Sequence, residues 1–340
     1  MSHLQIGLAI GGIVLLLVMT VQAIWINRRS RPRQATSGSA DNATDTEPQL
    51  DVAAFDAANF PAPSPERRPA MDALIDVIAA IALEASVSGE AALAALPGTR
   101  RAGSKPYAIE GFNELSQRWE VPLAGQRYSS FQAGVQLANR SGALNEIEYS
   151  EFVIKTQAFC DAINGTPDFP EMLEEVARAR ELDQFASEHD AQLGFVLRAR
   201  SAAWSPGYVQ QSAARLGFVA GAIPGRMVLP ASAAGMPAML GLSFDAQAAL
   251  AEDPSQSAIH ALAISLDVAQ VDRAERAFER MREVALALAD SMDGVVTDDK
   301  GLALTPQAMD QIGAELAHLY DTLDQHALAA GSPLARRLFS

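Results

Sequence analysis

The chain has 340 residues and a formal net charge of −15, from 26 Lys and Arg against 41 Asp and Glu. Nucleic-acid phosphates and anionic lipid headgroups repel a body this acidic, so nucleic acid is excluded as an expected partner. The single cysteine, Cys160, excludes an intramolecular disulfide and is typical of a reducing cytoplasm. We predict that Cys160 is a small buried residue.

Residues 4–26 form an uncharged run rich in Ile, Leu and Val. At about 1.5 Å per residue, a helix of this length matches the roughly 30 Å hydrocarbon core of a bilayer. No Lys or Arg precedes the run, and four arginines follow it: Arg28, Arg29, Arg31 and Arg33. This asymmetry places the rest of the chain in the cytoplasm and the N-terminus outside. A cleaved secretory signal has its charge on the other side and a shorter apolar run, so residues 1–27 are predicted to be an uncleaved anchor.

Gly7 and Gly11 have the small-xxx-small spacing through which two anchors can pack, although glycine is also common in membrane helices generally. The segment that follows, residues 28–69, contains five prolines that prevent regular helix or sheet: Pro48, Pro61, Pro63, Pro65 and Pro69. We expect a flexible linker that keeps the folded part near the membrane without fixing its orientation.

The first folded region is predicted over residues 70–190. Its strands are expected at residues 72–83, 107–112, 131–138 and 151–159, where β-branched and aromatic residues gather. Ser88 is expected to cap a short helix that ends at Pro97-Gly98. The amphipathic pattern of residues 171–186 predicts a second helix.

The second folded region is predicted over residues 191–330. Its strands are expected at residues 192–200, 218–223, 239–244, 259–268 and 295–296, and its helices at residues 206–217, 272–292 and 305–328. Ser205-Pro206 and Thr305-Pro306 have the residue order that favours a helix N-terminus.

Both regions have the order strand, helix, three strands, helix, at an interval of about 120 residues. The sequence therefore predicts an α+β fold with two tandem modules, each an antiparallel sheet covered by helices on one face. The helices at Met172–Phe185 and Phe278–Met292 are expected to occupy corresponding places in the two modules.

No motif for catalysis or for a cofactor is found. The five histidines lack the spacing of a metal site, and G-x-S-x-G, the P-loop and G-x-G-x-x-G are absent from the sequence. We therefore expect no enzyme activity, no metal and no cofactor.

The last third of the chain resembles a known family. The helix ERAFERMREVALALADSM is followed by DGVVTDDKGLALTPQ, Asp293 to Gln307, and this end is similar to the C-terminal domain of the ZipA family. RLGFVAGAI and MLGLSF resemble its helix end and its inner strands, so the resemblance covers about Gln192 to Leu328. In the first region, LANRSGAL, Leu137 to Leu144, is similar to a hairpin of the same family.

The resemblance implies a bacterial inner-membrane division protein with a proline-rich linker, whose partner is the C-terminal tail of FtsZ. In the family that tail lies in a shallow apolar groove on the exposed face of the sheet. Carried over by position, the binding face comprises Val196, Ile223, Gly241, Ser243 and Ser265, with Met227 and Met239 nearby. Strand alternation supports this assignment of Gly241 and Ser243 to the exposed face, because Leu240, Leu242 and Phe244 then face the helices.

This face departs from the family pattern, because small or polar residues stand where the family has bulky apolar ones. Two functions therefore remain open. The chain tethers FtsZ filaments to the membrane through one of its two modules, or it is an anchored adaptor of the same fold with a different protein partner.

Overall fold

The computed structural model describes residues 71–251 and 257–340. The predicted anchor and linker, including Gly7 and Gly11, lie outside these residues. Among the described residues, no helix combines the length and the apolar character needed to cross a bilayer. The described chain divides into two compact units, and each is an antiparallel sheet with helices. We call residues 71–190 with 323–340 the N-terminal unit and residues 191–322 the C-terminal unit.

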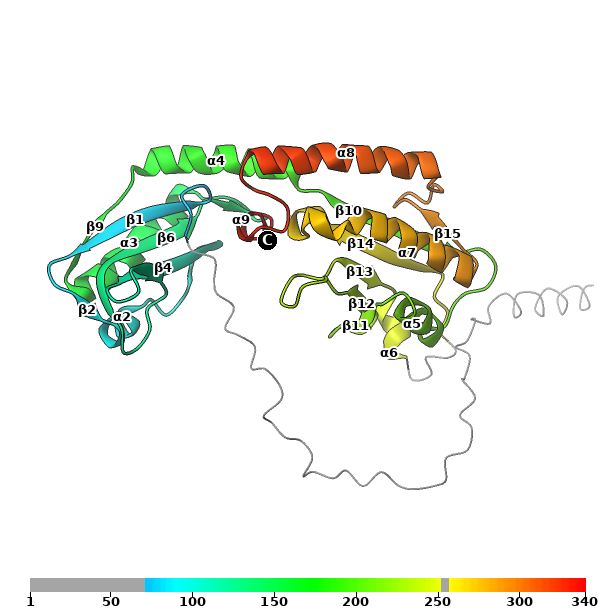
Figure 1. Ribbon diagram of the computed structural model, residues 1–340, viewed down its shortest axis with the longest axis horizontal. Coiled ribbons are helices and arrows are strands. Elements are labelled where there is room, and N and C mark those ends of the chain that lie inside the picture. The colour runs from blue at the N-terminus through cyan, green and yellow to red at the C-terminus, as the bar shows by residue number, and fades with distance from the viewer. Residues whose placement is uncertain (1–70, 252–256) are drawn as a thin grey trace, which may run out of the picture. The chain divides into compact units, whose positions relative to one another are not determined.

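The sheet of the N-terminal unit has the strand order β3-β4-β6-β1-β9 (Figure 1). Its long strands are β1 (Asp76–Leu83), β4 (Lys105–Asn113), β6 (Arg127–Gln136) and β9 (Gly165–Asp168). The short strands are β2 (Val87–Ser88), β3 (Arg101–Ala102) and β5 (Arg118–Glu120), with β2 on β6 and β5 on β4. The predicted hairpin is confirmed, because β7 (Ala138–Asn139) pairs with β8 (Gly142–Ala143).

Helices cover one face of this sheet. They are α2 (Gly89–Ala95), α3 (Glu146–Ile163) and α4 (Met172–His189), with α9 (Pro333–Leu338) near the end of the chain. Ser88 caps α2 as predicted, because its hydroxyl accepts the Ala91 N–H. Aromatic rings join α3 to the sheet, with Phe131 and Phe159 centred 5.3 Å apart in an edge-to-face contact. Cys160 is fully buried in this core, as predicted.

The predicted strand at residues 151–159 is wrong, because this segment lies inside α3. Asn145 caps α3 in a reciprocal capping box with Glu148, which fixes the start of the helix. The buried residues of α3 then recur every three or four positions, as on one face of a helix: Tyr149, Phe152, Thr156, Phe159, Cys160 and Ile163. The strand that the sequence analysis missed lies further on, at Gly165–Asp168.

The sheet of the C-terminal unit has the strand order β11-β12-β13-β14-β10-β15. The strands are β10 (Gln192–Ala199), β11 (Val219–Ala220), β12 (Arg226–Leu229), β13 (Leu240–Ser243), β14 (Ala261–Asp267) and β15 (Gly294–Thr297). The sequence predicted all of them except β12, and it predicted β11 longer than it is. Every pairing between these strands is antiparallel.

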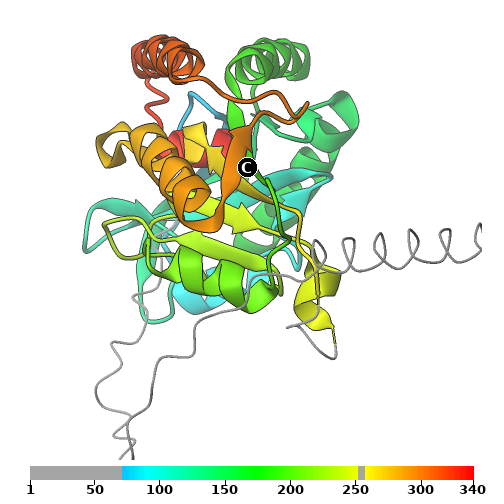
Figure 2. The same cartoon turned by 90° about the vertical axis from the view of Figure 1, so that its right-hand side faces the viewer.

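The helices of this unit are α5 (Pro206–Ala214), α6 (Ala246–Leu250), α7 (Ala277–Met292) and α8 (Pro306–Gln325). Ser205 caps α5 with proline at the first helical positions, as predicted. The predicted helix at residues 272–292 begins later, because Arg276 adopts a left-handed conformation between a short 3-10 turn and α7. In Figures 1 and 2, α7 lies along the sheet.

The two sheets share one connection pattern. In each, the first strand (β1 or β10) lies between the strand before the long helix (β6 or β14) and the strand after it (β9 or β15). Each long helix, α3 or α7, ends on a left-handed residue, Asn164 or Asp293, both with φ 54°. A glycine follows each of these and begins the next strand: Gly165 opposite Leu83, and Gly294 opposite Ala199.

The predicted correspondence between helices is therefore wrong in its details. By order and pairing, the counterpart of α7 is α3, whereas α4 follows β9 as α8 follows β15. The error has a single cause, because reading residues 151–159 as a strand shifted the comparison by one helix.

The two glycines after the long helices provide a test of this packing. A Cβ atom at Gly165 would lie 2.9 Å from the Ile81 side chain, and one at Gly294 would lie 2.9 Å from Leu197. Because Ile81 and Leu197 are each only 1% exposed, neither can move away. Gly165→Ala and Gly294→Ala should each lower the free energy of unfolding by roughly 1–3 kcal/mol in urea denaturation. Gly98→Ala is the control, since nothing lies within 4 Å; equal stability of all three variants would contradict the packing.

Candidate peptide-binding site

The outer face of the C-terminal unit's sheet, opposite the helices, carries small side chains. Across the central strands, Val196 pairs with Ala263 and Ser243 pairs with the same alanine. Ser265 pairs with Gly194 on one side and with Gly241 on the other. Because directly paired residues of antiparallel strands point to the same side, these residues form one continuous surface. We call it the outer face, and it extends over Val228, which pairs with Gly241, to Val219, which pairs with Val228.

The other face of the same sheet is the core. The intervening residues Phe195, Leu197, Leu240, Leu242 and Ile264 are each at most 3% exposed. Phe195 meets Phe278 of α7 edge to face, with the ring centroids 6.2 Å apart. α5 packs beside α7, where the Tyr208 hydroxyl donates to the Ser291 carbonyl oxygen at 3.0 Å, and the Trp204 indole N–H just before α5 donates to the Met292 carbonyl oxygen at 2.8 Å. Helices therefore cover one side of this sheet, and the predicted split between Leu240 or Leu242 and Gly241 or Ser243 is confirmed.

The structure brings four of the seven predicted site residues together on the outer face: Val196, Gly241, Ser243 and Ser265. Met239 is half-buried, stands just before β13 and follows the same alternation as Gly241. Ile223 is 54% exposed and lies in the connection between β11 and β12, where its carbonyl oxygen accepts the Arg226 N–H. It is therefore at one end of the sheet rather than on a strand.

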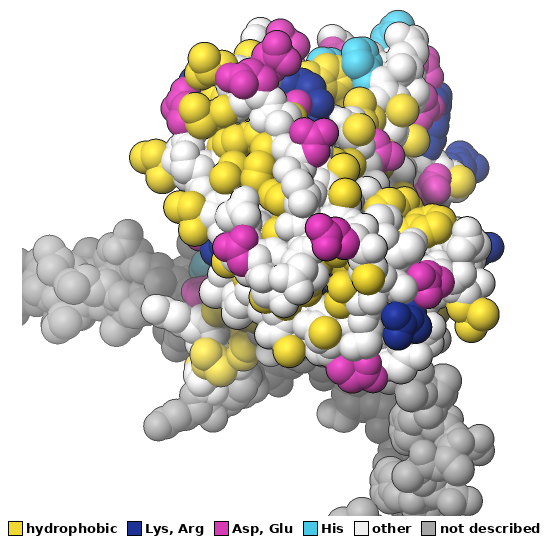
Figure 3. Space-filling view, turned by 90° about the vertical axis from the view of Figure 1, so that its left-hand side faces the viewer, with side chains coloured by type: hydrophobic (Ala, Val, Ile, Leu, Met, Phe, Trp, Pro, Cys, Tyr) yellow, Lys and Arg dark blue, Asp and Glu magenta, His cyan; other side chains and the backbone are white. Residues whose placement is uncertain are grey.

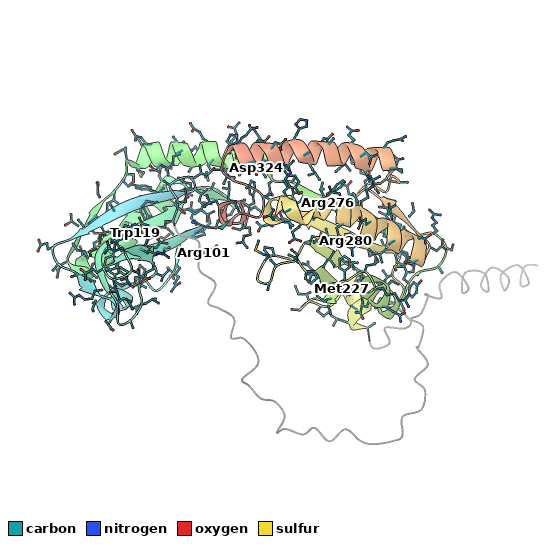
Figure 4. All side chains as sticks on the ribbon, in the orientation of Figure 1. Arg101, Trp119, Met227, Arg276, Arg280 and Asp324 are labelled. Carbon is teal, nitrogen blue, oxygen red and sulfur yellow. The ribbon has the colours of Figure 1, made fainter. Side chains whose placement is uncertain are left out.

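Met227 does not belong to this surface. It pairs with Leu242, whose side chain is in the core, and Met227 itself is only 5% exposed (Figure 4). The prediction that Met227 lies on the binding face is therefore wrong. The physical reason is the strand register, which directs the Met227 side chain into the core. The missed strand β12 explains the error, because without it the side on which Met227 points is undefined.

Sequence reasoning also missed two residues of the outer face, Val228 and Ala263. Val228 is on the unpredicted strand β12, although the alternation of Met227 and Leu229 around it was a usable signal. Ala263 is within a predicted strand and has the same parity as Ser265, so its place on the face followed from alternation alone.

The outer face can accommodate an extended apolar segment. Its ionisable side chains lie at the margins: Arg198 and Arg226, both exposed, and Asp267, which pairs with Gln192 and follows the same alternation as Ser265. Among the described residues, no cluster of three His, Cys, Asp or Glu side chains could hold a metal. Cys160 lies in the other unit, and burial raises the pKa of its thiol to about 11, which keeps it protonated at neutral pH.

One buried ionisable group elsewhere needs an account. Lys105 of β4 is 1% exposed, and its ammonium donates to Asn139 Oδ1 at 3.0 Å. Burial lowers the pKa of this amine. Asn139 also accepts from the Ser141 N–H and hydroxyl, so Lys105 ties β4 to the β7–β8 hairpin. The contacts of Lys105 thus give it a structural role.

The placement of the two methionines predicts different costs on truncation. Met227→Ala opens a cavity in the core and should lower the free energy of unfolding by roughly 2–5 kcal/mol. Met239→Ala removes a half-buried side chain beside the outer face and should cost much less. Urea unfolding of the two variants side by side measures both changes. Equal losses would contradict the register that separates the two methionines.

Comparison with known proteins agrees with part of this picture. The family model described as ZipA, C-terminal FtsZ-binding domain, matches residues 249–315. The matched residues comprise β14, α7, β15 and the first half of α8, and Ser265 is the only predicted site residue among them. No curated protein matches the chain. Residues 249–315 are thus similar to the C-terminal FtsZ-binding domain of ZipA.

Proposed function

We propose that the protein tethers FtsZ filaments to the cytoplasmic face of the bacterial inner membrane, by binding the C-terminal tail of FtsZ on the outer face. One observation carries this proposal: residues 249–315, which match an FtsZ-binding domain, include β14, and β14 lies in the middle of a sheet covered by helices on one side only. An open sheet face with small side chains lets a peptide lie close to the strands.

The energetics favour a peptide with several apolar side chains. Each fully buried aliphatic side chain contributes about 1.5–3 kcal/mol. Association costs at least about 4 kcal/mol in lost freedom of motion, so a single anchor on this shallow face is not enough. Two buried side chains barely offset this cost, so a useful affinity needs three or more apolar side chains of the peptide. These side chains would pack against Val196, Val228 and the neighbouring small residues. The arginines at the margins of the outer face, Arg198 and Arg226, then influence the orientation of the bound peptide more than its affinity.

The membrane part of the proposal depends on residues 1–69. The uncharged run at residues 4–26, with four arginines directly after it, supports a single-pass anchor with a cytoplasmic body. Gly7 and Gly11 would then lie within that anchor. Membrane anchoring is also a property of the ZipA family, and the proline-rich segment at residues 28–69 suits a linker between anchor and sheet.

We further propose that the two units are tandem copies of one module, with domains at residues 70–190 and 191–330. The shared strand order supports this, as does the pair of left-handed residues, Asn164 and Asp293, at the ends of equivalent helices. Each is followed by a glycine packed on the first strand of its own sheet. Such a local coincidence is hard to obtain from unrelated folds with similar element orders.

A second candidate function keeps the fold and changes the partner. The outer face presents Gly, Ala, Ser and Val where the resemblance leads one to expect bulky apolar residues. A membrane-anchored adaptor whose partner is a protein other than FtsZ fits this shallower surface. Binding of the FtsZ tail peptide decides between the two.

A charge in the middle of the outer face tests the site. In Val196→Glu the new carboxylate would be desolvated under the peptide without a partner, so affinity for the FtsZ tail peptide should fall on the order of 100-fold or more. Isothermal titration calorimetry on the full chain in detergent measures this. Gln210→Glu adds the same charge on exposed α5 and should bind like the original protein. A folded Val196→Glu protein with unchanged affinity would move the site elsewhere.

Topology is tested separately. A reporter fused after Ser340 should show cytoplasmic activity, because the arginines after residue 26 hold the body on that side. The protein should also stay in the membrane fraction after carbonate extraction. Periplasmic reporter activity, or release by carbonate, would contradict the anchor while leaving the peptide-binding proposal intact.

A further inference from the structure

A groove of about 390 Å³ opens on the N-terminal unit. Its floor is formed by the outward-facing residues of β4, Pro106 and Ala108, on the side of the sheet away from α3. Its walls are Leu96 and Pro97, which follow α2, and Val121, which follows β5. The lining is therefore mostly apolar, and it lies on the sheet face away from α3, where α9 covers only one end through Arg336 and Arg337.

Three arginines border this apolar groove: Arg100, Arg336 and Arg337. The described residues of the N-terminal unit carry 11 Lys and Arg against 20 Asp and Glu, a formal charge of −9. In Figure 3, acidic side chains are scattered among apolar ones and basic side chains are few. The groove is thus bordered by positive charge although the unit as a whole is negatively charged. This local positive charge favours an acidic ligand in the groove.

The bonding of these side chains leaves capacity for a ligand. Arg337 pairs with buried Asp76 through Nη2, whereas its buried Nη1 has no hydrogen-bond partner among the described residues. Arg100 is exposed and makes no ion pair within the described chain. The one acidic side chain of the lining, Glu110, is already engaged, because it accepts from the Met71 N–H at 3.2 Å and from Gln132 Nε2 at 2.8 Å. An incoming carboxylate would therefore meet the exposed Arg100 guanidinium directly, and Arg337 Nη1 only after that side chain shifts.

From this arrangement we infer that the groove is a second peptide-binding site, which takes an extended segment with apolar side chains and at least one carboxylate. The inference rests on the proposed function for the identity of the ligand, which is a second FtsZ tail. One chain then holds two tails, one on the outer face and one in the groove. Two linked sites raise the apparent affinity for a filament, which presents many tails, by roughly 10²–10⁴-fold over a single site.

Charge at the groove floor provides the test, because Ala108 is exposed on β4 and its replacement leaves the core intact. Ala108→Glu places a carboxylate beneath the bound peptide and should weaken that site roughly 100-fold. Ala80→Glu is the matched control, since Ala80 is also exposed on the same sheet face but on β1, outside the groove lining. Unchanged melting transitions ensure that the variants are folded.

Calorimetry with the FtsZ tail peptide on the full chain in detergent should give two peptides per chain. Either Ala108→Glu or Val196→Glu should leave one, both together should leave none, and Ala80→Glu should keep two. One peptide per chain, lost only with Val196→Glu, would overturn the groove while the proposed function stands. No binding to the unaltered chain would instead overturn the proposed function. A peptide of residues 53–70 can be tested as a competitor of the FtsZ tail on the Val196→Glu protein. If this peptide displaces the tail with equal affinity, the groove binds a segment of the chain itself, and the inference is overturned.

Discussion

One-sided burial of an antiparallel sheet is the constraint on which the rest of the structure depends. In each unit the first strand lies inside the sheet, and every second residue on it is sealed against helices. The period of two along a strand then sends the intervening residues to the opposite face, which α3 and α7 do not cover. The side chains on that second face can change without loss of the core, so a binding surface can evolve there.

Much of this arrangement was predictable from local sequence. The caps at Ser88 and Ser205 mark helix starts through a side-chain acceptor, which is a local interaction and so is visible in the sequence. The alternation from Leu240 to Ser243 likewise gave both faces of β13. Such signals survive because the residues that produce them are neighbours along the chain.

Two of the errors arose where the deciding interaction is distant, and one where a local signal was missed. Residues 151–159 contain enough β-branched and aromatic residues to suggest a strand, yet the cap at Asn145 and the period of the buried rings make them helical. Met227 was placed on the wrong face because its direction depends on pairing with Leu242, a partner fifteen positions away. The groove beside Arg337 was not predicted at all, since it joins β4 to the end of the chain.

The two sheet faces suit passive attachment better than chemistry. The outer face consists mostly of small and aliphatic side chains, and the groove of the N-terminal unit adds three arginines to an apolar floor. An otherwise acidic surface that gathers positive charge beside an open sheet is suited to selecting an acidic, apolar peptide from among other chains.

The central claim is that the FtsZ tail lies on the outer face of the C-terminal unit, and methyl NMR tests it most directly. The full chain in detergent, labelled at valine and methionine methyl groups, is titrated with the tail peptide. The account predicts shifts at Val196, Val228 and Met239, with Met227 and the α7 residue Met281 unchanged. Shifts confined to Met227 and Met281, or none at the valines of the outer face, would contradict it.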